Sequence, residues 1–141
     1  GKVDLTMVLN GALAGLVSIT AEPLTPTMGW TCFIGGVGGV IVVYGVPLLD
    51  KFKIDDVVGA IPVHLFAGIW GTLAVVLTNP EAVVGKQIYG IVVVGVFTFV
   101  ASGAAWIILN AILGIRVSEE DEITGLDTAE LGMEAYPDFV R

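Results

Sequence analysis

The feature that most limits how this chain can fold is a series of long segments without a charged side chain. The longest, residues 87–115, runs for 29 residues without a charge, and residues 57–77 form another such run. About 20 apolar residues in an α-helix are enough to cross the hydrocarbon core of a bilayer. We therefore predict an all-α membrane protein, a polytopic helical bundle with four spans at about residues 5–21, 28–49, 57–78 and 87–115.

The composition supports this class and excludes others. The chain is 55% hydrophobic and 14% charged, which is unusual for a soluble domain. Eight of the 14 acidic residues follow Val117, so the net charge of −8 belongs mainly to an acidic tail, residues 117–141. Six scattered basic residues give no support for nucleic-acid binding. One histidine and one cysteine on separate helices do not make a catalytic pair, so we expect no enzyme, cofactor or metal site.

The only histidine, His64, lies inside the third predicted span. An ionisable side chain at that depth is costly, which makes it a candidate functional residue. Helical spacing puts Ala60, Gly68 and Gly71 on its face, so we predict that His64 points inward, beside a pore or a neighbouring helix. Pro62 predicts a kink just before it. The alternative is a neutral histidine that only donates a hydrogen bond between packed helices.

Small and polar residues predict contacts in the first two spans. Gly11 and Gly15 form a G-x-x-x-G pair, and Asn10 beside them is expected to bond to a neighbouring helix. The sequence GGVGG at residues 35–39 predicts close packing of the second span. We interpret these residues as structural.

Three stretches together resemble one known family. The run IDDVVGAIPVHLFAGIWGTLAVVL around His64, the upstream run LNGALAGLVSITA and the tail RVSEEDEITGLDTAELGMEAYP resemble the ammonium transporter (Amt/Rh) family, in the right order and spacing. The resemblance covers nearly the whole chain. The family fold has eleven membrane helices, and this chain looks like the last four plus the C-terminal tail. We therefore expect a partial sequence.

The resemblance implies transport of ammonium or ammonia by a homotrimer in which each subunit has its own narrow pore. His64 matches the second histidine of the pair at the pore centre, and Asp56 matches an acidic position at the start of its helix. Ala60 and Gly68 belong to the pore-helix face. The alternative within this resemblance is an ammonium sensor that binds without conducting. Pro62 departs from the family, where a small residue such as Ser is common.

The tail resembles the family's regulatory C-terminus, which implies Gly125, Asp127 and Tyr136 as regulatory residues and a PII-type signalling protein as a partner. Leu131 and Met133 replace the family's His and acidic residue there. Ser118 is placed as a helix N-cap before the acidic run EEDE. The apolar residues of the tail predict docking on the membrane part; the alternative is a disordered acidic tail.

The basic residues predict the orientation. With four spans, Lys2, Lys51, Lys53 and Arg116 fall on one side and only Lys86 on the other. Because basic residues concentrate on the cytoplasmic side, the C-terminal tail is predicted to lie in the cytoplasm of a multi-pass plasma-membrane protein.

Overall fold

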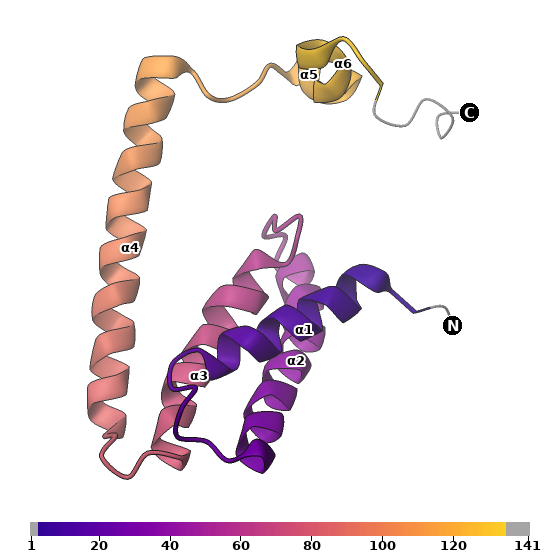
Figure 1. Cartoon of the computed structure of the whole chain (residues 1–141). Helices are drawn as coiled ribbons and strands as arrows, with labels where there is room; N and C mark the ends of the chain where they lie inside the picture. The colour runs from indigo at the N-terminus through magenta and orange to yellow at the C-terminus, as the bar shows by residue number, and fades with distance from the viewer. Residues whose placement is uncertain (1–2, 135–141) are drawn as a thin grey trace. The chain divides into compact units, whose positions relative to one another are not determined.

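A computed structural model describes residues 3–134, and within them every regular element is helical. The elements are α1 (Leu5–Ile19), α2 (Met28–Lys51), a π-helical segment η1 (Ile61–Phe66), α3 (Ala67–Ala74), a 3₁₀ turn η2 (Val75–Leu77), α4 (Val84–Leu113), α5 (Glu119–Thr124) and α6 (Leu126–Leu131) (Figure 1). The predicted all-α fold class is confirmed.

Two of these helices, α2 and α4, are long and apolar enough to cross a bilayer. The helix α1 and the continuous segment Ile61–Leu77 are apolar but shorter. All four helical segments overlap the predicted spans, and the largest difference is the third, which begins at residue 61 rather than 57. A count of four membrane-spanning helices therefore stays a prediction.

The start of α1 is set by Asp4, its N-cap residue. The Asp4 carboxylate accepts a hydrogen bond from the Met7 backbone N–H at 3.1 Å and one from the Thr6 hydroxyl at 2.6 Å. Both hydrogen bonds favour the charged carboxylate and so lower the pKa of Asp4, and the bond from the Thr6 hydroxyl has the larger effect. The cap thus satisfies a backbone N–H group of the first helical turn that has no partner within the helix.

Within the unit Gly1–Gly95, the helices α1, α2 and α3 pack together through a small core. Ala14 of α1, Val42 of α2, Val63 of η1 and Ala67 of α3 are almost completely buried in it. Such small residues let helix axes approach closely, which is how helices associate when lipid removes the usual hydrophobic driving force.

The close contacts that the glycines of the first two spans predict are present between α1 and α2. A Cβ built on Gly15 would lie 3.4 Å from the Gly35 backbone oxygen, so α1 and α2 touch at these two glycines. Gly38 meets Ser18 and the Ala14 backbone oxygen, whereas Gly36 has nothing within 4 Å. The GGVGG sequence therefore contacts α1 through one face only.

The long helix α4 differs, because it buries none of its residues within the described part of the chain. It is followed by Gly114, which has a φ of 63° and so takes the left-handed conformation that closes many helices.

Candidate functional site

His64 lies in the π-helical segment η1, and its side chain is exposed. Its neighbours Pro62 and Val63 are buried, as is Ala67 at the start of α3. Among residues 3–134 no hydrogen-bond partner of the imidazole is found, so the structure does not support the alternative of a histidine that bonds between these packed helices. The segment is thus anchored on one side and presents His64 on the other.

The four residues of the predicted common face, His64, Ala60, Gly68 and Gly71, lie in different settings within the described part of the chain. His64 and Ala60 are exposed, whereas Gly71 is buried against the Ser18 backbone of α1. Gly68 also faces α1, since a Cβ built there would lie 3.8 Å from Val17 Cγ1. Within this chain the helices that pack with the His64 segment contact Pro62, Val63 and Ala67, whereas His64 is exposed, so an inward orientation of His64 in the whole protein stays a prediction.

The physical reason for these different settings is the π-helical turn. The Ala67 N–H bonds to the carbonyl oxygen of Pro62, five residues earlier, as well as to that of His64. A turn closed from residue i to i+5 holds one more residue than an α-helical turn, so residues four apart no longer stack. Spacing rules for an α-helix therefore fail between His64 and the glycines that follow. Such π-turns occur frequently at functional sites.

The predicted kink at Pro62 is wrong. Pro62 stands in the first turn of the helical segment, where its missing N–H would have no intrahelical partner. Its ring instead packs on α2: a Cβ built on Gly45 would lie 2.9 Å from Pro62 Cβ. The irregularity near His64 is the π-turn, and Pro62 anchors it.

Asp56 caps the start of this helical segment. Its two carboxylate oxygens accept the backbone N–H groups of Ala60 and Ile61, each at 2.8 Å. Free N–H groups and the helix dipole at a helix start both favour a carboxylate there. Asp56 thus fixes where the His64 segment begins, a role consistent with its predicted position.

Three side-chain hydrogen bonds join the part of the chain around His64, residues 58–79, to α1, α2 and the connector between them. Asn10 Nδ2 of α1 donates to the Val58 carbonyl at 3.0 Å. The prediction that this amide bonds to a neighbouring helix is therefore wrong in its partner, because Val58 lies in the connector before η1. Trp70 Nε1 donates to the Ile34 carbonyl of α2 at 2.9 Å, and Asn79 Nδ2 donates to Glu22 at 2.8 Å. The last two were not predicted, since nothing in the spacing of these residues marks them as partners.

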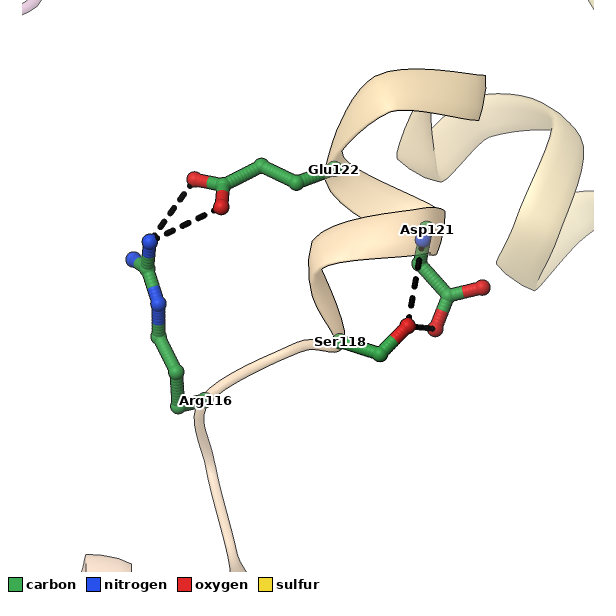
Figure 2. A network of polar contacts seen from close by, with 4 residues as sticks. All are labelled: Arg116, Ser118, Asp121 and Glu122. Atoms are coloured by element: carbon green, nitrogen blue, oxygen red, sulfur yellow. Dashed lines mark hydrogen bonds and ion pairs between the residues drawn. The ribbon is translucent and has the colours of Figure 1, made fainter.

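The tail begins as predicted with Ser118 as the N-cap of α5. Figure 2 shows the Ser118 hydroxyl oxygen accepting the Asp121 N–H at 3.1 Å, and the exposed ion pair of Arg116 with Glu122 at 2.8 Å beside it. Exposed pairs of this kind contribute about 0–1 kcal/mol, so the cap defines the helix more than the pair does.

The regulatory candidates of the tail occupy different settings. Gly125 has a φ of 100° and separates α5 from α6. Asp127 stands in the first turn of α6, and its carboxylate accepts the Thr128 N–H at 3.0 Å. Leu131 and Met133 are exposed. Tyr136 lies outside the described residues. Within residues 3–134 no three His, Cys, Asp or Glu side chains gather to bind a metal ion.

Comparison with known proteins decides the family. The sequence profile of the Ammonium Transporter Family matches residues 1–136. The chain belongs to the ammonium transporter family. This is a family of helical membrane proteins and of transporters rather than enzymes, in agreement with the fold class.

Several members of the ammonium transporter family match this chain along nearly its full length. It is 40% identical to ammonium transporter Amt2 of Archaeoglobus fulgidus, over 99% of this chain and 34% of that protein. It is 36% identical to ammonium transporter Amt1 of Haloferax mediterranei, over 99% of this chain and 28% of that protein. It is 33% identical to the ammonium transporter of Bacillus subtilis, over 97% of this chain and 38% of that protein. The chain spans about a third of the length of the curated relatives it matches.

Proposed function

We propose that this chain forms part of a pore that carries ammonium or ammonia across the plasma membrane, with His64 as the second histidine of a pair at the pore centre. The observation that carries the proposal is the setting of His64. It is the chain's only histidine, and it is exposed on a helix whose other side is buried in the helix packing. The family membership supports the choice of substrate.

The chemistry of the imidazole suits this task. A bare ammonium ion in an apolar pore loses its hydration and is strongly disfavoured. A neutral imidazole can replace a lost water partner, or can accept a proton, because its proton affinity lies near neutral pH. His64 and Ala60 expose a surface beside the packed face of the same segment. In the whole transporter, further helices would cover this surface and supply the first histidine of the pair.

The test is uptake by the whole transporter after His64→Ala, compared with Leu65→Ala. Leu65 is the next residue and is also exposed, so the control truncates a side chain on the same turn. We expect His64→Ala to lower methylammonium and ammonium uptake by roughly a hundredfold at equal membrane abundance, and Leu65→Ala to change it little. Equal uptake by both variants would refute a pore role for His64. Binding of ammonium without flux in liposomes by the parent protein would indicate a sensor instead.

The proposal extends to orientation and assembly. The excess of Lys51, Lys53 and Arg116 on one side of the predicted spans supports a cytoplasmic tail. Labelling of a cysteine at position 130 from outside intact cells would contradict it. Family membership supports a homotrimer, measurable as the mass of the purified protein in detergent, and a tail that docks beneath the helices and binds a PII-type protein. Unchanged uptake after deletion beyond Val117 would argue against tail regulation.

A further inference from the structure

The segment that enters the His64 helix is held from a distant part of the chain. Asn10 of α1 donates its side-chain N–H to the Val58 carbonyl at 3.0 Å, across 48 positions of sequence. Val58 lies in the turn directly before the helical segment that carries His64. The bond therefore joins α1 to the point where that segment begins.

Gly59 makes this bond possible. Its φ of 73° lies in the left-handed region that glycine adopts without strain. A Cβ at this position would lie 2.8 Å from Asn10 Nδ2 and 3.3 Å from Val46 Cγ2, so a side chain would push the amide away from the Val58 carbonyl. We call Asn10, Val58 and Gly59 the helix-start clamp, since the three residues act together.

The helix-start clamp connects to His64 without any intervening loop. The Gly59 carbonyl accepts the Val63 N–H at 3.1 Å, and the Gly59 N–H bonds to the Asp56 carbonyl at 3.1 Å. Asp56 also accepts the N–H groups of Ala60 and Ile61. The backbone from 56 to 63 is thus one hydrogen-bonded unit. A shift at Gly59 moves the residue before His64 directly.

We propose that Asn10 is a positioning residue for His64. It fixes the start of the π-turn, and through Val58, Gly59 and the bond to Val63 it sets where the imidazole lies. This inference rests on the proposed function, because the placement of His64 matters only if the imidazole meets the substrate. Small displacements of such a group are costly: about 1 Å can lower a rate roughly a hundredfold.

The test breaks the helix-start clamp from both sides in the whole transporter. Asn10→Leu keeps the number and branching of the side-chain heavy atoms but has no N–H to donate to the Val58 carbonyl, and it adds no charge to an apolar helix. Gly59→Ala displaces the same amide from the other side. The matched controls are Asn110→Leu in α4, whose side chain makes no hydrogen bond within residues 3–134, and Gly36→Ala, whose added Cβ would meet nothing within 4 Å among the same residues.

Two measurements separate positioning from simple support of the fold. Amide hydrogen exchange of residues 57–66 is expected to rise roughly tenfold in both clamp variants, the factor that a lost hydrogen bond carries, and to stay unchanged in both controls. The maximal methylammonium uptake rate per folded transporter is expected to fall about tenfold in both clamp variants, with KM changed less than about twofold.

Each outcome decides the proposal. Unchanged exchange in residues 57–66 would overturn it, because the bond then does not hold the segment. Faster exchange with an unchanged uptake rate per folded molecule would also overturn it, since Asn10 would then support the fold alone. A parent protein that takes up no ammonium would refute the proposed function itself and the positioning role with it. Failure of the variants alone leaves the proposed function standing.

Discussion

The helices α2 and α4 are alike in sequence and opposite in packing. Both are long, apolar and rich in glycine. The glycines Gly35, Gly38 and Gly45 of α2 each meet another segment, and five residues of the helix are buried. Among residues 3–134, a Cβ built on Gly85, Gly90, Gly95 or Gly103 of α4 would meet nothing within 4 Å, and none of the residues of α4 is buried.

The difference shows that an apolar composition does not by itself define a contact. Both helices satisfy the length and hydropathy that a bilayer requires, yet of the two only α2 has glycines where an added Cβ would meet another segment among the described residues. A glycine in such a place is required, and one elsewhere is only tolerated.

The largest effect is expected for Gly38→Ala. A Cβ there would meet the Ser18 hydroxyl and would lie 2.7 Å from the Ala14 backbone oxygen. The hydroxyl can rotate away, but the backbone oxygen moves only with α1. Overpacking of this kind costs about 1–3 kcal/mol. We expect a clear fall in the thermal unfolding midpoint of the purified transporter.

The controls for this substitution are Gly36→Ala on the same helix and Gly95→Ala on α4, because among residues 3–134 a Cβ at either position would meet no other segment within 4 Å. Both are expected to leave the midpoint unchanged or to raise it, since alanine favours a helix over glycine by up to about 1 kcal/mol. Equal midpoints for Gly38→Ala and Gly36→Ala would break the comparison. A fall caused by Gly95→Ala would show that α4 packs on another surface in the whole transporter.

The sequence predicted the helices better than the connections between them. Runs without charge located α1, α2 and α4 because helices in a bilayer need such runs, and Ser118 marked its helix because side chains of this type cap helix starts. The third segment was placed four residues early, since hydropathy does not register that Asp56 caps the N–H groups of Ala60 and Ile61.

The candidate site was predicted only in part, because local sequence patterns do not register irregular turns or distant contacts. His64 stands out as the only histidine, but its face depends on the π-turn, and no spacing rule for an α-helix anticipates a turn with an extra residue. The bonds of Trp70 to Ile34 and of Asn79 to Glu22 join residues 36 and 57 positions apart. Such contacts depend on how helices are arranged in space, which a single sequence does not contain.

A smaller effect is expected for Trp70→Phe. The Trp70 indole N–H donates to the Ile34 carbonyl at 2.9 Å, and its ring lies edge-on to Phe33 with centroids 6.4 Å apart. Phenylalanine keeps an aromatic ring but loses the donor, so we expect a loss of about 1 kcal/mol in the free energy of unfolding. The control is Trp106→Phe on α4, whose side chain is exposed. If chemical denaturation gives equal losses for both, the indole bond adds nothing to the packing.

The smallest effect concerns the ends of the two long helices. The helix α4 is followed by Gly114 at a φ of 63°, and α2 is followed by Lys53 at a φ of 56°. Around Lys53 the backbone forms the two bonds of a Schellman motif: the Lys53 N–H donates to the Asp50 carbonyl at 2.9 Å, and the Ile54 N–H to that of Leu49 at 3.0 Å. The same left-handed conformation is thus taken by glycine in one helix and by lysine in the other.

Lys53→Gly should therefore stabilise the protein. A residue with a Cβ loses roughly 1–2 kcal/mol in the left-handed conformation, and the greater freedom of glycine in the unfolded chain offsets about 0.4–1 kcal/mol of that gain. We expect a net gain of about 0.5–1 kcal/mol by chemical denaturation. Lys51→Gly removes the same charge from the last residue of α2, where the backbone is helical, so glycine should destabilise by up to about 1 kcal/mol. Changes of opposite sign in the free energy of unfolding for Lys53→Gly and Lys51→Gly would show that the backbone conformation at each position decides the effect of glycine. A loss of stability in both variants would mean that the lysine side chains, through their charge, matter more than the backbone at this end of α2.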